Sequence, residues 1–227
     1  MRVILFDIDG TILRGNGEGK AAMLEAMRRV ARTPFNENNA IQGKTDLQFL
    51  HECLDPVMGT EAVQKITPQI FQEYEQLLGA SYIPGVGIRL LPGVVPLLDA
   101  LAARRDCLIG LLTGNIQQGA RIKLGLFSLF ERFGIGAFGE DGRHREDLPP
   151  VALDRARTHT GLGELQGSAL VIIGDTENDV RCGRPIGARS LAVATGFDSP
   201  EKLKRENPDA FFDDLSDTDA VLDFLFD

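Results

Sequence analysis

The sequence predicts an α/β fold, a doubly wound parallel sheet with a small all-helical domain inserted after its first strand. Three observations support this prediction. Short apolar runs alternate with amphipathic segments, which is typical of parallel strands joined by helices. Acidic or small polar residues follow directly after several of these runs. Residues 17–82, between the first and second runs, show apolar residues at helical spacing only.

The composition is that of an ordinary globular protein. The 227 residues are 43% hydrophobic and 25% charged, which suffices to bury a sizeable core with a smaller inserted domain. The formal charge of -9 argues against a nucleic-acid surface, because binding to a phosphate backbone needs clustered Lys and Arg. If the substrate is itself an anion, a local cation must offset the charge of the chain.

The sequence also bears on the compartment. The N-terminus has one Arg and a short apolar run, unlike a signal peptide, and no apolar run approaches membrane-spanning length. We therefore expect a cytoplasmic protein with no membrane partner. The three cysteines are far apart, odd in number and without metal-ligand spacing, so we expect free thiols in a reducing compartment: Cys53, Cys107 and Cys182.

The first predicted strand, Val3–Phe6, ends abruptly in two acids one residue apart. Asp7 and Asp9 are followed by Gly10 and Thr11, which indicates a turn at the end of a buried strand. Open α/β sheets bind ligands at the carboxyl ends of their strands, so carboxylates in this place favour chemistry. Taken alone, Asp-x-Asp-Gly also occurs in ordinary turns and in calcium loops.

The inserted segment contains three predicted helices. Apolar residues recur at helical spacing over 21–32, from 46 to 54 and over 60–78. Pro68 should kink the third helix or divide it in two. We therefore assign residues 17–82 to a helical domain, and residues 1–16 and 83–227 to the α/β core.

From Ile83 onward the pattern changes to alternating strands and helices. A helix opens at Leu91-Pro92-Gly93, with Pro92 in the first turn, where its missing N–H is tolerated. Residues 134–139 match G-x-G-x-x-G, but an acidic loop follows instead of a helix, so we interpret them as a strand. The other elements follow in chain order: strand 107–112, a helix through 122–124, a helix from 148, strand 169–174, strand 190–195, strand 210–212 and helix 219–226.

Two later strands deliver polar side chains to the same edge of the predicted sheet. Thr113 follows the second strand, and Asp175 and Asp179 follow the β-branched run of the fourth. With parallel topology these residues converge with Asp7 and Asp9. Carboxylates packed together repel one another, so they stay ionised only beside a cation. Oxygen ligands without His or Cys select a hard ion, and we expect Mg2+.

Such a site suits phosphoryl transfer. One carboxylate can act as the nucleophile, as aspartates do in enzymes that form an aspartyl phosphate. A second carboxylate, two residues on, can protonate the leaving oxygen and then activate water. That second role requires a pKa above the ordinary value of about 3.9.

Three motifs carry a resemblance to a known family: Asp7-Ile8-Asp9-Gly10-Thr11, Leu112-Thr113-Gly114-Asn115 and Gly174-Asp175-Thr176-Glu177-Asn178-Asp179. In this order, with a helical insert between the first two, the chain resembles the haloacid dehalogenase (HAD) superfamily, specifically its phosphoglycolate phosphatase type. The resemblance covers almost the whole chain. It implies a Rossmann-like core with a helical cap. It also implies magnesium-dependent hydrolysis of a small phosphate monoester, phosphoglycolate or a sugar phosphate, through an aspartyl-phosphate intermediate.

The resemblance also implies a role for each motif residue. Asp7 would be the nucleophile, Asp9 the general acid and base, and Thr113 would hold the transferring phosphoryl group. Asp175 would bind magnesium with Asp7 and the backbone carbonyl of Asp9, and Asp179 would support the metal or its waters. Neighbouring motif residues are expected to contact the substrate: Gly10, Thr11, Gly114 and Asn115.

One part departs from the family pattern. These enzymes usually place a Lys between the second and fourth motifs, but residues 125–201 contain none. We expect Arg145 to replace it, with Arg143 as the second choice, because a guanidinium can hold phosphate in bidentate fashion. In the cap we expect Lys44 and Thr45 to face the substrate, since a Lys there suits a carboxylate or a second anionic group.

Three functions are compatible with these residues: a phosphatase, a phosphomutase of the β-phosphoglucomutase type, and a non-catalytic regulator on the same fold. The presence of both Asp7 and Asp9 disfavours the regulator. It also disfavours a dehalogenase, because the resembling dehalogenases lack the second aspartate. The cap discriminates phosphatase from mutase, since it excludes or admits water. As partners we expect a small-molecule phosphate monoester and no nucleic acid, for a monomer or homodimer.

Overall fold

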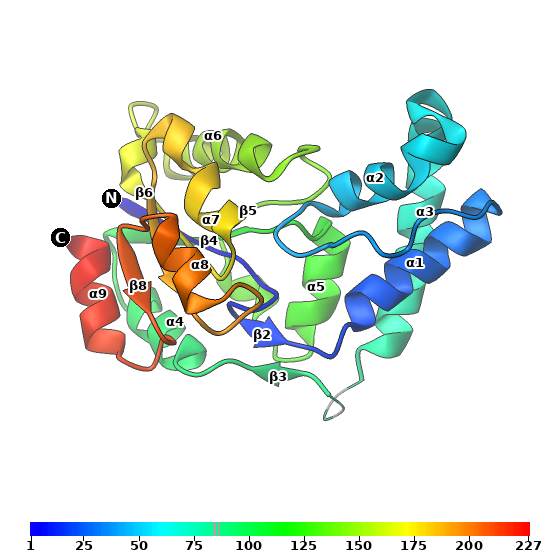
Figure 1. Ribbon diagram of the computed structural model, residues 1–227. Helices are drawn as coiled ribbons and strands as arrows, with labels where there is room; N and C mark the ends of the chain where they lie inside the picture. The colour runs from blue at the N-terminus through cyan, green and yellow to red at the C-terminus, as the bar shows by residue number, and fades with distance from the viewer. Residues whose placement is uncertain (84, 86) are drawn as a thin grey trace.

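The computed structural model describes residues 1–83, 85 and 87–227 (Figure 1). Its centre is a six-stranded sheet in the order β5-β4-β1-β6-β7-β8, in which every neighbouring pair is parallel. This arrangement confirms the predicted doubly wound α/β fold. The strands are β1 (Arg2–Phe6), β4 (Cys107–Leu112), β5 (Ile135–Ala137), β6 (Leu170–Gly174), β7 (Arg189–Val193) and β8 (Ala210–Phe212).

Strand β1 lies in the middle of the sheet because its side chains from Val3 to Phe6 are apolar and fully buried. It pairs with β4 on one side and with β6 on the other, so that Ile4 lies opposite both Ile109 and Val171. The chain runs outward from β1 through β4 and β5, then returns to β6 and runs outward through β7 and β8. Open α/β sheets bind ligands at such a reversal of strand order.

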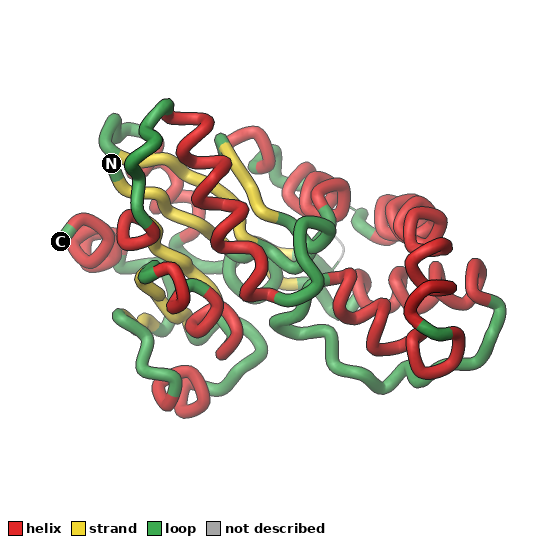
Figure 2. Tube along the Cα trace, turned by 90° about the horizontal axis from the view of Figure 1, so that it is seen from above, coloured by secondary structure: helices red, strands yellow, loops and turns green. Residues whose placement is uncertain are grey.

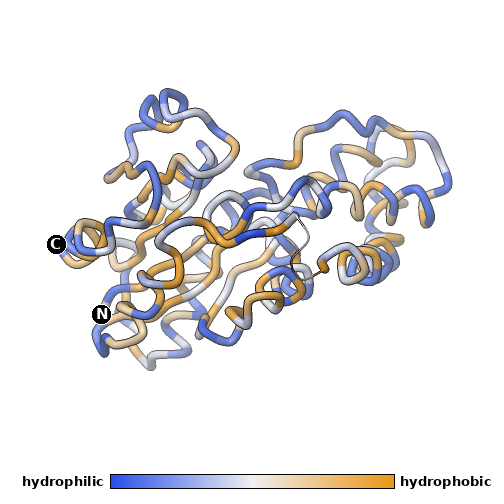
Figure 3. The backbone as a smooth tube through the Cα atoms, turned by 90° about the horizontal axis from the view of Figure 1, so that it is seen from below, coloured by the Kyte–Doolittle hydropathy of each residue, from blue (hydrophilic) through white to orange (hydrophobic). Residues whose placement is uncertain are grey.

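Alternate residues of β1 face two hydrophobic cores. Ile4 and Phe6 pack on the side of α4, α5 and α9, whereas Val3 and Leu5 pack on the side of α6. Figure 2 shows the helices on both sides of the strands, and Figure 3 shows hydrophobic segments running through the middle of the trace. The core helices are α4 (Val94–Ala102), α5 (Gln117–Gly125), α6 (Leu148–Thr160), α7 (Glu177–Cys182), α8 (Pro200–Arg205) and α9 (Thr218–Phe226), with short 3₁₀ turns at Phe130–Arg132, Arg145–Asp147, Gly167–Ala169 and Arg184–Ile186.

The inserted segment folds into three helices, α1 (Glu18–Ala31), α2 (Asp46–Met58) and α3 (Thr60–Ser81). Helices α1 and α2 both pack on α3, and α3 also contacts α5 of the core. Figure 1 shows the three helices gathered beside the α5 end of the sheet. The assignment of 17–82 to a separate cap domain stays a prediction.

The structure differs from the sequence prediction in the division at Pro68 and in the position of Pro92, and it contains a short sheet that was not predicted. Pro68 does not divide α3, because residues on both sides of it, including Val63, Ile70 and Tyr74, are buried against the rest of the molecule. Pro92 precedes Gly93, the residue that caps α4, and so lies outside the helix. Residues 13–14 and 89–90 form a two-stranded antiparallel sheet, β2 (Leu13–Arg14) with β3 (Arg89–Leu90), which is too short to give a periodic signal. None of the helices in the described part of the chain is long and apolar enough to cross a membrane.

Candidate active site

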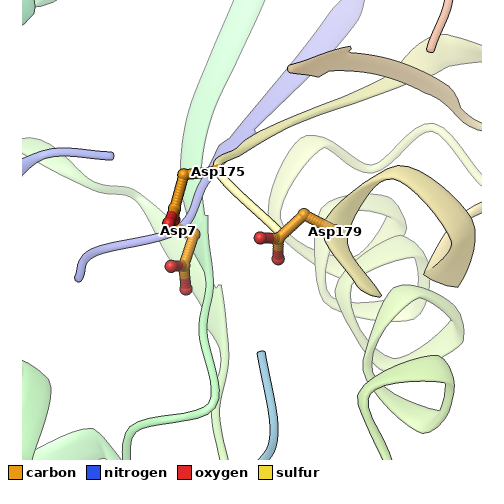
Figure 4. A group of neighbouring side chains, drawn as sticks. All are labelled: Asp7, Asp175 and Asp179. Carbon is orange, nitrogen blue, oxygen red and sulfur yellow. The ribbon is translucent and has the colours of Figure 1, made fainter. Parts of the chain in front are cut away.

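Three neighbouring strands end in the residues that form the candidate site. Because β1, β4 and β6 are parallel and in register, Asp7, Thr113 and Asp175 arrive at one edge of the sheet. Asp179 joins them from the first turn of α7. Figure 4 shows the carboxylates of the three aspartates turned toward a common space. Gly10 permits this approach, since its φ is 93° and an added Cβ would lie 2.4 Å from Asp175 Oδ2.

The three carboxylates form a buried acidic cluster. Asp7, Asp175 and Asp179 each offer one oxygen, and these oxygens all lie within 4.8 Å of one another. Burial raises the pKa of Asp7 to about 6; Arg145 opposes the shift, and the Asp179 and Asp9 carboxylates reinforce it. Burial, followed by Asp179 and Asp7, raises the pKa of Asp175 well above its usual range. Full ionisation of the cluster is therefore unfavourable, and an added cation would favour it.

Arg145 is the cation that the protein itself places in this cluster. Its Nη2 donates to Asp7 Oδ1 at 2.9 Å, to Asp179 Oδ1 at 2.5 Å and to the carbonyl of Leu112 at 2.8 Å. The side chain is 5% exposed. Arg143, the other arginine considered, instead pairs with Asp55 of α2 and is 41% exposed. Of the two arginines, Arg145 therefore lies in the site.

Both carboxylate oxygens of Asp179 accept hydrogen bonds. Its Oδ2 accepts hydrogen bonds from the backbone N–H of Thr176 at 3.0 Å and from the Thr176 hydroxyl at 2.6 Å, and its Oδ1 accepts from Arg145. The first pair of contacts closes a capping box at the start of α7. Asp179 thus both begins the helix and orients Arg145.

The donor set fits a hard divalent cation. Asp7 and Asp175 are carboxylates at adjacent strand ends with raised pKa values, and only one guanidinium balances the three acids. Carboxylate oxygens are the ligands that magnesium prefers. The acidic cluster that the sequence predicted is therefore present, and the identity of the metal stays a prediction.

Asp9 points away from this cluster toward two donors. Its Oδ2 accepts from the Asn115 side-chain amide at 2.8 Å and from Lys123 Nζ at 2.6 Å. Lys123 is 4% exposed. Burial opposes its charge, but Asp9 and the nearby tyrosines raise the pKa of Lys123 well above its usual range. The ammonium group is therefore charged at neutral pH.

A cavity of about 310 Å³ connects these groups. Its floor contains the strand-end residues, and its other walls come from the inserted segment. The core residues that line it include Asp7, Asp9, Gly10, Gly114, Asn115, Lys123, Arg145 and Thr176, and the inserted segment contributes Gly19, Lys20, Gly43, Lys44, Asp46, Tyr74 and Tyr82.

Some of the predicted substrate-binding residues line the cavity and others do not. Gly10, Gly114, Asn115 and Lys44 line the cavity, although the Lys44 ammonium is paired with Glu52 of α2. The three predicted threonines are buried and are not among the residues that line the cavity. Their hydroxyls bind other protein groups: Thr11 donates to Asp175, Thr45 donates to the Arg143 carbonyl, and Thr113 accepts from Asn115. Their roles in substrate binding stay predictions.

Residues at the start of α2 and just before it connect the inserted segment to the site. Asp46 donates its backbone N–H to the Gly114 carbonyl at 2.7 Å, and its carboxylate accepts from the Ile116 N–H at 3.0 Å. Asn178 donates to the Gly43 carbonyl at 2.8 Å. Residues 43–46 therefore dock on the loop that follows β4 and on the first turn of α7.

Sequence reasoning missed Lys123, Asp46, Tyr74 and Tyr82. One signal was available for Lys123. On α5 it shares the buried stripe of Gly119, Ala120 and Leu124, and a lysine at such a position needs a partner.

Comparisons with known proteins found a similar family model and similar proteins. Residues 147–218 match a family model described as HAD-hydrolase-like. A phosphoglycolate phosphatase from Xylella fastidiosa is 28% identical over 203 residues, which cover 88% of this chain and 83% of that protein. A phosphoglycolate phosphatase from Synechococcus elongatus is 27% identical over 221 residues, covering 96% of this chain and 95% of that one.

Solved structures share the fold at lower identity. A hydrolase from Pseudomonas syringae superimposes with a TM-score of 0.71 at 20% identity, covering 100% of both chains. A β-phosphoglucomutase from Clostridium difficile superimposes with a TM-score of 0.70 at 16% identity, covering 98% of this chain and 96% of that one.

Proposed function

We propose that this chain is a haloacid dehalogenase-like hydrolase and that it acts as a magnesium-dependent phosphatase. Its substrate would be a small phosphate monoester, of the phosphoglycolate or sugar-phosphate type, and the reaction would proceed through an aspartyl phosphate. The observation that carries the proposal is that the two aspartates after β1 have different surroundings. Asp7 lies in the acidic cluster beside Arg145, whereas Asp9 lies on the cavity wall beside Asn115 and Lys123.

In the first step an oxygen of Asp7 attacks phosphorus, and the ester oxygen leaves with a proton from Asp9. Arg145 holds Asp7 Oδ1, so the nucleophile is fixed in one orientation. The hydrogen bonds that Asp9 accepts from Asn115 and Lys123 both fall on Oδ2, so we assign proton exchange to Oδ1. In the second step Asp9 takes a proton from water, which attacks the aspartyl phosphate and frees Asp7.

Asp7, Asp175 and the backbone carbonyl of Asp9 would hold the magnesium ion, with Asp179 supporting its surroundings. When bound, the ion would offset negative charge on the phosphoryl oxygens and on the carboxylates around them. Arg145 is held between Asp7 and Asp179 by contacts with the protein itself. The protein's own contribution to the electrostatics is therefore preorganised.

The test is phosphate release from a panel of monoesters, with magnesium and with a chelator, for the wild type and for Asp7→Asn. The matched control is Asp213→Asn, the same substitution at an exposed position far along the chain. We expect release that needs magnesium, survives in Asp213→Asn and is lost in Asp7→Asn. An Asp7→Asn variant with the wild-type rate would overturn the nucleophile assignment. Release of phosphate from no ester would overturn the phosphatase.

A further inference from the structure

Asp46 is the first residue of α2, and the inserted segment brings it to the wall of the cavity, where it is buried. A buried carboxylate needs hydrogen-bond partners. The Asp46 backbone N–H donates to the Gly114 carbonyl at 2.7 Å, and its Oδ2 accepts from the Ile116 N–H at 3.0 Å. Asp46 therefore binds both chain neighbours of Asn115.

Asn115, between these two contacts, holds the proposed general acid. Its side-chain amide donates to Asp9 Oδ2 at 2.8 Å and to Thr113 Oγ1 at 2.8 Å. A side-chain amide has two N–H groups, so these contacts occupy the amide and fix its orientation. The position of Asp9 Oδ2 therefore depends on the loop that Asp46 holds.

Asp46 also acts on the helix that carries the second donor to Asp9. Ile116 precedes α5, and its apolar side chain cannot cap that helix. The Asp46 carboxylate accepts the Ile116 N–H from 70 positions away, and a carboxylate is favoured at the start of a helix. Lys123 lies on the same helix, and its Nζ donates to Asp9 Oδ2 at 2.6 Å.

The core provides the next contact at the start of α5. Both carboxylate oxygens of Glu140 accept from the Gln117 N–H at 2.9 Å. The helix therefore keeps one carboxylate at its start when the Asp46 side chain is removed. What the Asp46 side chain adds is the contact at Ile116, directly beside Asn115.

We propose that Asp46 is a positioning residue for the general acid. It holds the chain on either side of Asn115, so that Asp9 Oδ2 stays bound and Oδ1 is the oxygen that exchanges the proton. The proposal rests on the proposed phosphatase function and adds a residue of the inserted segment to it. A general acid must lie within about 2.6–3.2 Å of the oxygen that it protonates. A displaced Asp9 would therefore protonate the leaving oxygen poorly.

The test compares two esters whose leaving groups differ in their need for a proton. Benzyl phosphate releases an alkoxide, which needs a general acid, whereas para-nitrophenyl phosphate releases a phenolate that the nitro group stabilises. We expect Asp46→Ala to lower kcat/KM for benzyl phosphate by about tenfold or more, which is part of the roughly 10²–10⁴-fold that a general acid contributes. For para-nitrophenyl phosphate we expect a much smaller loss, because its leaving group departs without a proton.

Two further variants separate the hydrogen bond from the presence of a polar side chain. Asp46→Asn keeps an oxygen that can accept from the Ile116 N–H, so it should retain most of the wild-type rate with benzyl phosphate. Asp46→Ser is polar, but its side chain is too short to reach that N–H. It should therefore lose as much as Asp46→Ala, and it covers the case in which Asp46→Ala does not fold.

The matched control is Asp217→Ala, which removes a carboxylate from the start of another helix. Asp217 accepts from the Ala220 N–H at 3.2 Å at the start of α9, which packs on α4 and β1. We expect this variant to leave kcat/KM for both esters unchanged.

Three outcomes overturn the proposal. Equal losses for the two esters in Asp46→Ala would mean that Asp46 only shapes the cavity. Wild-type kcat/KM for both esters in Asp46→Ala would mean that Asp9 is positioned without it. An Asp46→Asn variant that loses as much as Asp46→Ala would exclude the hydrogen bond to Ile116 as the cause. In each of these cases the wild type still releases phosphate, whereas failure of the proposed function would abolish release from both esters.

Discussion

The Nη2 atom of Arg145 lies 2.9 Å from Oδ1 of Asp7, and both side chains are buried at the end of β1. The same nitrogen contacts Asp179 and the carbonyl of Leu112. Arg145 therefore ties the proposed nucleophile to β4 and α7 at once. We propose that Arg145 replaces the lysine that the family pattern predicts, since residues 125–201 contain no lysine.

We expect Arg145→Met to impair both activity and stability, because it leaves three buried carboxylates without a protein cation. Losing an electrostatic stabiliser of this kind costs about 10²–10³-fold in kcat. Removing one partner of a buried pair destabilises a fold by about 3–5 kcal/mol. Phosphate release and urea denaturation in chelator measure the two effects. Arg143→Met is the control, since its pair with Asp55 is 41% exposed on the arginine side and is expected to change stability by less than about 1 kcal/mol.

Strands β1 and β6 could be predicted from the sequence because their apolar runs are short and are ended by acids. The same feature identified Asp7, Asp9, Asp175 and Asp179. Their strands are neighbours in a parallel sheet, and residues at neighbouring strand ends must lie together.

Contacts between the inserted segment and the core could not be predicted in this way. Lys123 and Asp9 are 114 positions apart, and no periodicity links them. Asp46 follows Thr45 in an ordinary helix-start pattern, and only the docking of α2 places it against Ile116. Arg143 and Arg145 are two residues apart in the sequence, and the 3₁₀ turn at Arg145–Asp147 decides which one faces inward.

We expect magnesium to stabilise the fold, because it binds only when the strand ends are assembled. At a concentration of 100 times the dissociation constant, a ligand of the native state adds about 2.7 kcal/mol to the free energy of unfolding. Thermal unfolding with and without magnesium measures this shift without any substrate. Asp175→Asn removes a buried carboxylate and should abolish most of it. A variant that keeps the full shift would exclude Asp175 as a ligand.

Asp46 should make stability depend on pH. Burial raises the pKa of Asp46 to about 7, although Lys123 and the Ile116 N–H oppose the shift. The native state therefore keeps this proton in a window, from about pH 4 to about pH 7, where the unfolded chain has lost it. The Asp46 side chain therefore lowers the free energy of unfolding as pH rises through that window, by at most about 1.4 kcal/mol per pH unit.

Asp46→Asn removes this titration and can still accept from the Ile116 N–H. We therefore expect its stability relative to the wild type to increase between pH 4 and pH 7 and then to level off. Urea denaturation in chelator at several pH values measures the difference between the two proteins, in which the contributions of the other groups largely cancel. A difference that stays constant over this range would contradict the raised pKa.

Gly114 marks the tightest contact between the inserted segment and the core. An added Cβ there would lie 1.9 Å from the carbonyl oxygen of Lys44, so Gly114→Ala must push residues 43–46 away from the loop after β4. We expect a loss of about 1–3 kcal/mol in stability, as for other overpacked sites, together with a lower kcat/KM, because Lys44 and Asp46 line the cavity.

Gly79→Ala in α3 is the control, since an added Cβ there meets no atom within 4 Å and a helical Ala gains up to about 1 kcal/mol over Gly. If Gly114→Ala retained the wild-type kcat/KM while Gly79→Ala behaved as expected, the contact between residues 43–46 and this loop would have no part in catalysis.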